Sequence, residues 1–130
     1  MKPESAAYLN KARQFLGKAQ TLFDELYWPD EAGRAAYLAA LHAAQALIFE
    51  TTGKVIKRHS GVHSKFSELV RAEPRVDDEL RAFLGRAYNL KAVADYEAGP
   101  GAQVSPEKAR AAIATARRFV ECVTSLINVR

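Results

Sequence analysis

Residues 31–52 read EAGRAAYLAALHAAQALIFETT. Large apolar side chains recur in this stretch at intervals of three or four residues, which is the period of one face of an α-helix. That face consists of Tyr37, Ala40, Leu41, Ala44, Leu47 and Ile48. Alanine fills many of the positions between them and allows neighbouring helices to approach closely. The stretch therefore predicts a long helix, with Asp30 as its N-cap and Gly53 as its C-cap.

The same period continues on both sides of this stretch. Before it, residues 5–27 predict a long helix that ends at Trp28-Pro29-Asp30 because proline cannot continue the hydrogen-bond ladder. Its apolar stripe is Leu9, Ala12, Leu16, Ala19, Phe23 and Leu26. After it, Ser60-Gly61 should cap a short helix over 62–72, which Pro74 closes, and 76–97 should form a fourth helix.

A break and a cap separate the last helix from the fourth. Gly99-Pro100-Gly101 disfavours any regular element, and Ser105-Pro106-Glu107 supplies an N-cap, a first-turn proline and an acidic residue. No strand pattern is present in the sequence. We therefore expect an all-α fold, an up-and-down antiparallel bundle of three long and two shorter helices, in a single domain over 1–130. The expected core is Leu16, Phe23, Leu41, Ile48, Leu84, Ile113, Val120 and Val123.

Composition excludes several classes of protein. The 130 residues are 48% hydrophobic and 26% charged, which is ordinary for a globular domain. Cys122 is the only cysteine, so an intrachain disulfide and a thiolate zinc cage are excluded, and we expect its thiol to be buried and inert. Neither a signal peptide nor a membrane span is evident, which favours a soluble, cytoplasmic protein.

The positive charge is concentrated in one segment. The chain carries 19 basic and 15 acidic residues, and residues 51–67 contain no acid. Their basic residues are Lys54, Lys57, Arg58 and Lys65, together with His59 and His63. Such a segment favours RNA, a nucleotide phosphate or an acidic protein face as its ligand. The alternative is a solvated loop with a few lysines.

Three short motifs occur in a fixed order along this helical pattern. They are Arg34-Ala35-Ala36-Tyr37, Leu41-His42-Ala43-Ala44 and His59-Ser60-Gly61-Val62-His63, which Phe66 follows. In this order they resemble the HEPN family of bacterial and archaeal helical domains, over about residues 5–127. The resemblance implies a small helical bundle, often a homodimer, that is frequently produced with a minimal nucleotidyltransferase as a toxin–antitoxin pair.

Many members of that family resemble ribonucleases that use an arginine and, four to six residues later, a histidine in the fourth helix. Here Lys91 stands where the branch of the family that the three motifs resemble usually has arginine, and Asp95-Tyr96 stands where the ribonucleases have the histidine. We therefore predict a binding module, with a metal-independent ribonuclease as the alternative. The alternative would use His63, Asp95 and Lys91. Arg58 and His63 also satisfy the arginine–histidine spacing, but they lie before the third helix and not in the fourth. The other interpretation of these two residues is that they bind a phosphate or cap a helix.

The predicted nucleotide- or RNA-binding residues come from the second helix, the basic segment and the fourth helix. They are Arg34, Tyr37, Lys54, Lys57, Arg58, His59, Lys65 and Tyr96. In the purely structural interpretation Asp95 forms an ion pair with Arg34 or Lys91, and His42 is a buried, hydrogen-bonded core residue. The spacing of the histidines matches no metal site, and we expect no cofactor.

Overall fold

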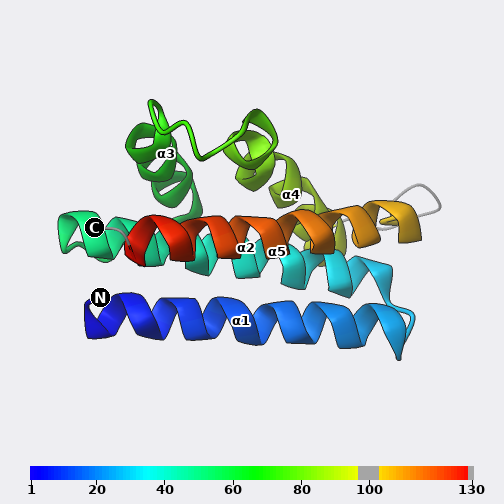
Figure 1. Ribbon diagram of the computed structural model, residues 1–130. Coiled ribbons are helices and arrows are strands. Elements are labelled where there is room, and N and C mark those ends of the chain that lie inside the picture. The colour runs from blue at the N-terminus through cyan, green and yellow to red at the C-terminus, as the bar shows by residue number, and fades with distance from the viewer. Residues whose placement is uncertain (97–102, 129–130) are drawn as a thin grey trace.

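The computed structural model describes residues 1–96 and 103–128, and this part of the chain is all helical (Figure 1). Its five helices are α1 (Pro3–Asp24), α2 (Pro29–Thr52), α3 (His59–Val70), α4 (Asp78–Tyr96) and α5 (Pro106–Asn128). The expected all-α bundle is confirmed. Helices α1, α2 and α5 lie side by side as long rods, and α3 and α4 cover the side of α2 and α5 away from α1 (Figure 1).

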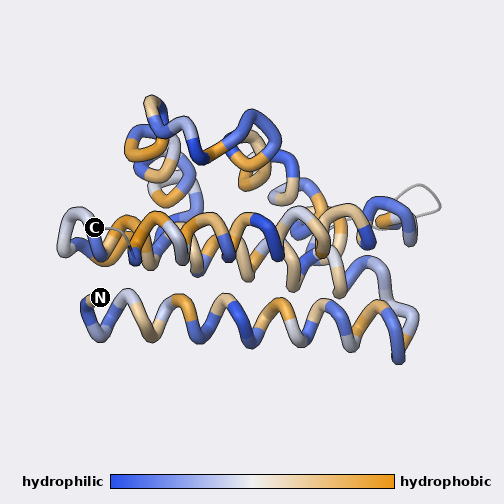
Figure 2. The backbone as a smooth tube through the Cα atoms, in the orientation of Figure 1, coloured by the Kyte–Doolittle hydropathy of each residue, from blue (hydrophilic) through white to orange (hydrophobic). Residues whose placement is uncertain are grey.

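Helix α2 is the centre of the bundle and packs against each of the other four helices. Its side chains are buried nearly all round, from Ala32 to Ile48. A helix without a polar face is stable only when neighbours cover every side, and its many alanines keep those neighbours close. Helices α1 and α5 instead alternate polar and apolar residues, as expected for helices with one buried face (Figure 2).

The ends of α2 confirm one expected cap and correct the other. Gly53 ends the helix in the left-handed conformation, φ 73°, and its N–H donates to the Phe49 carbonyl at 2.8 Å. Asp30, in contrast, is not the N-cap, because the helix begins at Pro29, whose fixed φ suits a first helical position. The Asp30 carboxylate instead accepts a hydrogen bond from the Val104 N–H at 2.6 Å.

The short third helix begins earlier than expected. It starts at His59, so Ser60 and Gly61 lie in its first turn and do not cap it, and it ends at Val70, well before Pro74. A Cβ at residue 61 would lie 2.9 Å from Ile56 Cγ2, so glycine here permits close packing of the connection against the helix. The predicted cap at Ser105 is confirmed, since its Oγ accepts from the Lys108 N–H at 3.1 Å. Gly99-Pro100-Gly101 lies outside the described residues.

The expected core is largely confirmed. The buried members are Leu16, Leu41, Ile48, Leu84, Ile113, Val120 and Val123. Phe23 is only half-buried, with the Arg110 guanidinium 5.1 Å from its ring centre, and Leu26 lies beyond the end of α1 and is exposed. Cys122 is also half-buried, and burial raises the pKa of its thiol. No helix in the described ranges is long and apolar enough to cross a membrane.

Candidate functional site

One buried tyrosine hydroxyl joins two histidines. Tyr37 of α2 is fully buried, and its Oη lies 2.8 Å from His59 Nδ1 and 2.8 Å from His63 Nε2. The two histidines are four residues apart in α3 and therefore lie on one face of that helix. A phenol can donate one hydrogen bond and accept another, so Tyr37 can satisfy both imidazoles at once. The early start of α3 at His59 is what makes this geometry available.

A fourth ring, from α4, completes this group. The centre of the Tyr88 ring lies 5.5 Å from that of Tyr37 and 5.8 Å from those of His59 and His63. We call Tyr37, His59, His63 and Tyr88 the histidine–tyrosine cluster. Tyr88 was not among the predicted site residues. Its spacing from Lys91 and Asp95, three and then four residues, places all three on one face of a helix and could have identified it.

Burial sets the protonation of the cluster. It is the main cause that lowers the pKa of both His59 and His63. The charge of Lys91 lowers the pKa of His59 further, and His59 does the same to His63. Burial also raises the pKa of Tyr37, with a smaller contribution from Tyr88. At neutral pH both imidazoles and the phenol are therefore uncharged, and each can donate and accept a proton.

Next to this cluster, one carboxylate forms ion pairs with two cations. Asp95 of α4 lies 2.8 Å from Arg34 Nε of α2 and 2.5 Å from Lys91 Nζ, one turn earlier in α4. We call these three residues the ion-pair cluster. The hydrogen bond from Lys91 is the main cause that lowers the pKa of Asp95, and the same bond raises the pKa of Lys91. All three side chains are therefore charged, with one positive charge in excess.

Lys91 connects the two clusters. Its charge acts on His59, and its Nζ lies 5.3 Å from the centre of the Tyr96 ring, which is 77% exposed. The structure thus brings together seven of the predicted site residues along the line where α2, α3 and α4 meet. They are Arg34, Tyr37, His59, His63, Lys91, Asp95 and Tyr96.

The remaining predicted residues lie apart from these two clusters. Lys54, Lys57 and Arg58 are exposed on the connection that leads into α3. Lys65 is on α3 itself, where its Nζ lies 3.2 Å from Glu68. Across 1–96 and 103–128, no hydrogen bond or ion pair joins these four side chains to either cluster.

His42 is hydrogen-bonded, as the structural interpretation expects, but it is only half-buried and is not one of the buried core residues. Its Nδ1 lies 2.7 Å from Gln45 Oε1, and its ring lies against that of Phe15. Burial is the main cause that lowers its pKa. The described residues contain no group of three or more histidine, cysteine or acidic side chains suited to a metal ion.

The arrangement suits anion binding better than base catalysis by Asp95. A carboxylate held by two cations has little affinity for a proton, so Asp95 is a weak general base. The neutral imidazoles of His59 and His63 are better placed to move protons, and the excess positive charge beside them favours a phosphate. The site therefore combines an excess of positive charge with a pair of neutral histidines.

Comparison with known proteins gives matches that span nearly the whole chain. A family model described as the HEPN domain matches residues 5–126. The UPF0332 protein glr0978 of Gloeobacter violaceus (strain ATCC 29082 / PCC 7421) is 30% identical over 121 residues, which are 93% of this chain and 94% of that protein. The crystal structure of TT1696 from Thermus thermophilus has a similar fold, with a TM-score of 0.74, 23% identity and coverage of 95% of this chain and 98% of that one.

Proposed function

Since the chain belongs to the HEPN domain family, we propose that it is a helical binding module for a phosphate group of a nucleotide or of RNA. In this proposal the phosphate lies at the ion-pair cluster, and the module works as a homodimer. Its protein partner is a minimal nucleotidyltransferase, in a toxin–antitoxin-like system. The family suggests the partner and the homodimer, whereas the side chains around Asp95 support the phosphate site.

The observation that carries the proposal is the unequal number of charges around Asp95. Arg34 and Lys91 share this single carboxylate, so an incoming phosphate finds one cation that is not fully neutralised. Guanidinium and ammonium groups are the side chains that hold phosphates best. Next to them, the neutral imidazole of His59 supplies a further donor or acceptor.

Two surrounding features support a nucleotide or an RNA strand over a free phosphate ion. The Tyr96 ring is exposed beside Lys91, where a base could stack on it. The exposed cations Lys54, Lys57 and Arg58 precede His59 along the chain and extend the positive surface away from the cluster. A strand that follows this surface would meet several cations in succession.

The proposal is tested by the binding of a fluorescent single-stranded RNA, measured by anisotropy over a range of salt concentrations. We expect log K to fall with log salt concentration by about 0.7 for each phosphate contact. Replacing Lys54, Lys57, Arg58 and Lys65 together with alanine should weaken binding and reduce that slope. Lys91→Gln should also weaken binding, whereas Lys11→Gln, on the exposed side of α1, should not. An affinity that salt and these substitutions leave unchanged would contradict the proposal.

The partner is tested separately. If the neighbouring reading frame encodes a small nucleotidyltransferase, the two chains should copurify after coexpression. Asp95→Ala should weaken that association or the stability of the fold, because it leaves Arg34 and Lys91 without their carboxylate. Failure of the two chains to associate would refute the pairing and leave the phosphate site standing.

A metal-independent ribonuclease is the second candidate, and one observation favours it. Tyr37 joins two neutral histidines, which could act as general base and general acid on a ribose 2′-hydroxyl. In that case His63→Ala or Asp95→Ala should reduce cleavage of single-stranded RNA by about 10²- to 10⁴-fold in a folded protein. We expect instead that the purified wild type cleaves nothing, since Lys91 and Asp95 stand in place of the arginine and histidine on which the family's ribonuclease chemistry depends. Robust cleavage that either substitution abolishes would establish the ribonuclease.

A further inference from the structure

The turn between α1 and α2 exposes an unusual set of apolar side chains. Leu26, Tyr27 and Trp28 are 50%, 79% and 57% exposed, and Trp28 is the only tryptophan of the chain. We call residues 24–31, DELYWPDE, the knob. Large apolar side chains that are exposed together mark interaction sites more often than ordinary surface, and tyrosine and tryptophan are the commonest anchors of protein interfaces.

The backbone of the knob is fixed in place on both sides. Tyr27 has φ 56°, and it is the only residue other than glycine with a positive φ in the described ranges. That conformation costs about 1 to 2 kcal/mol for an L-residue and persists only where neighbouring contacts enforce it. Here the Trp28 N–H donates to the Leu22 carbonyl at 2.9 Å, and Asp30 accepts from the Val104 N–H. The aromatic side chains are thus held outward before any partner arrives.

The knob is also strongly acidic. Asp24, Glu25, Asp30 and Glu31 lie within it, and no lysine or arginine occurs between residues 19 and 33. A surface that accepts the knob must therefore combine an apolar floor with positive charge at its edges.

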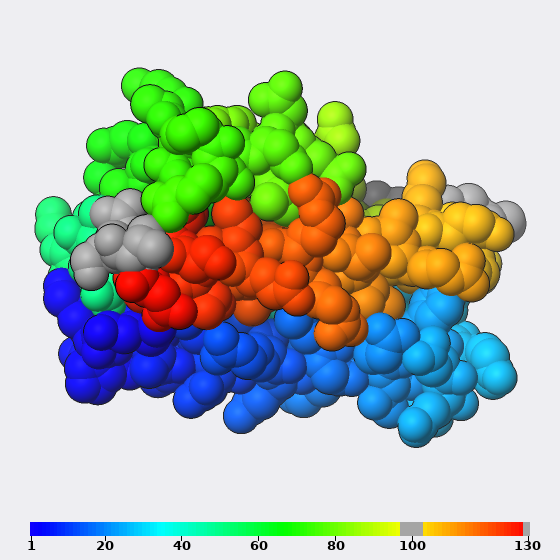
Figure 3. Space-filling model, viewed as in Figure 1, coloured from blue at the N-terminus to red at the C-terminus, as the bar shows by residue number. Residues whose placement is uncertain are grey.

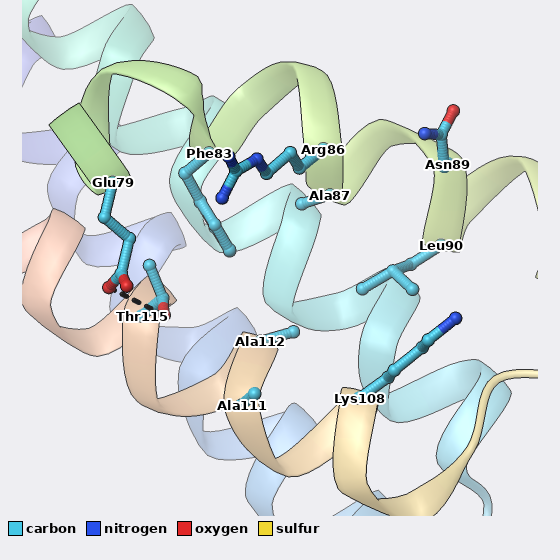
Figure 4. Close-up of a pocket in the computed structure, with 10 residues that line it drawn as sticks. All are labelled: Glu79, Phe83, Arg86, Ala87, Asn89, Leu90, Lys108, Ala111, Ala112 and Thr115. Atoms are coloured by element: carbon cyan, nitrogen blue, oxygen red, sulfur yellow. Dashed lines mark hydrogen bonds between the residues drawn. The ribbon is translucent and has the colours of Figure 1, made fainter.

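Such a surface exists between α4 and α5 (Figure 4). It is a groove of about 530 Å³ with an apolar floor formed by Phe83, Ala87, Leu90 and Ala112. Arg86 leans over it from α4, and Lys108 extends into it from α5. Neither side chain has an acidic partner within 1–96 and 103–128, whereas Glu79, at the far end, is bound by Arg118 and Thr115. The free charges of the groove are therefore positive.

We propose that the knob of one copy of this chain inserts into the α4–α5 groove of a second copy. The inference rests on the homodimer of the proposed function and names its interface. The apolar floor receives Trp28 and Tyr27, while Arg86 and Lys108 meet the acidic residues of the knob. The basic segment 51–67 also carries positive charge, and its exposed lysines provide the control for an interface held by charge alone.

Knob and groove lie at the same end of the bundle. Tyr27 and Pro29 share a surface hollow with Pro106 and Arg110 in the first turns of α5, and Lys108 of the groove lies between those two in sequence. The turn between α1 and α2 lies at the end of the molecule where α5 begins (Figure 3). A two-fold axis near the start of α5 would let each copy give its knob to the groove of the other, so the contact forms twice and the assembly closes as a dimer.

The test combines sedimentation velocity with the emission of the single tryptophan. Wild type should be a dimer, and its Trp28 emission should shift to the blue as concentration rises. Trp28→Ala and the pair Arg86→Glu with Lys108→Glu should each raise the dimer dissociation constant by at least about 30-fold, the effect of an interface hot spot. The matched control, Lys54→Glu with Lys57→Glu, makes the same change of charge at exposed positions and should leave the dimer intact.

Mixing the two defective variants identifies the contact directly. Trp28→Ala has an intact groove and no tryptophan, and the Arg86→Glu, Lys108→Glu variant has an intact knob. The Arg86→Glu, Lys108→Glu variant alone should show no blue shift. A blue shift that appears when Trp28→Ala is added therefore shows that Trp28 of the charge-reversed variant enters the groove of Trp28→Ala. If both variants still form the dimer, or if only the Lys54, Lys57 control fails to form it, the proposed interface is wrong but the homodimer stands. A wild type that stays monomeric at about 100 μM overturns both, while RNA binding by the monomer would preserve the phosphate site.

Discussion

Tyr37 holds two histidines with one hydroxyl group, so its hydroxyl and its ring make separable contributions. Tyr37→Phe keeps the ring and leaves both imidazoles without that partner. We expect it to lower the free energy of unfolding in urea by about 1 to 3 kcal/mol, the cost of unsatisfied buried polar groups. Tyr88→Phe is the matched control, because no hydrogen bond of its hydroxyl is present in the described residues, and its effect should be within about 0.5 kcal/mol. Equal effects of the two substitutions would show that the shared hydroxyl stabilises nothing.

The sequence predicted more successfully which residues lie near one another than which hydrogen bonds and ion pairs they form. Three residues predicted for binding or catalysis, Arg34, Tyr37 and Lys91, do belong to the two clusters, since Arg34 and Lys91 pair with Asp95 and Tyr37 bonds to His59. The ion pairs of Asp95 were one of two interpretations left open. The hydroxyl that His59 and His63 share was not predictable, because it depends on how α3 is rotated about its axis. The helix starts at His59, three residues before the predicted start, and that difference brings His59 into α3. Tyr88 was missed because it belongs to none of the motifs.

Helix α3 shows how a small error at an element boundary arises. Ser60-Gly61 has the composition of a helix cap. Gly61 instead lies in the first turn of α3, where the lack of a side chain lets Ile56 pack closely against it. Gly61→Ala should force that contact apart and lower the free energy of unfolding by about 1 to 3 kcal/mol, as overpacking does. Gly85→Ala is the control, because nothing lies within 4 Å of a Cβ at that position. Since alanine is a better helix former than glycine, this substitution should raise the free energy of unfolding by up to about 1 kcal/mol. A Gly61→Ala protein as stable as wild type would show that Ile56 moves aside freely.

The other elements were predicted from the period of their apolar residues, and their ends from proline, glycine and serine. The pattern could not show that Asp30 would bind the Val104 N–H, since the two residues are far apart in sequence. Nor could it show that α1 stops at Asp24, because Leu26 continues the apolar spacing that the exposed turn then interrupts.

For the whole molecule, the histidines determine how stability depends on pH. The pKa values of His42, His59 and His63 are all lowered in the fold, mainly by burial. The unfolded chain therefore takes up more protons than the fold below about pH 6.5, so stability should be constant from pH 8 to 7 and fall as pH drops further. Each histidine adds at most about 1.4 kcal/mol per pH unit.

Urea unfolding at a series of pH values measures this dependence. His63→Gln should give a shallower decline between pH 6.5 and 5, because one of the three contributing groups is gone. The carboxylate of Asp95, whose pKa is also lowered, contributes only at lower pH, where stability falls as that carboxylate is protonated. A wild type equally stable at pH 5 and pH 7 would contradict the assigned shifts.

The central position of α2 has a consequence for the order in which the chain leaves the ribosome. Helices α1 and α2 are synthesised before the other three helices and can pair at once as a hairpin of neighbours in sequence, the kind of contact that forms quickly. The sides of α2 that later contact α4 and α5 stay uncovered until those two helices have been made. Nascent chains therefore expose an alanine- and leucine-rich surface of α2 until α5 has been made, and a surface of this kind favours aggregation while it is uncovered.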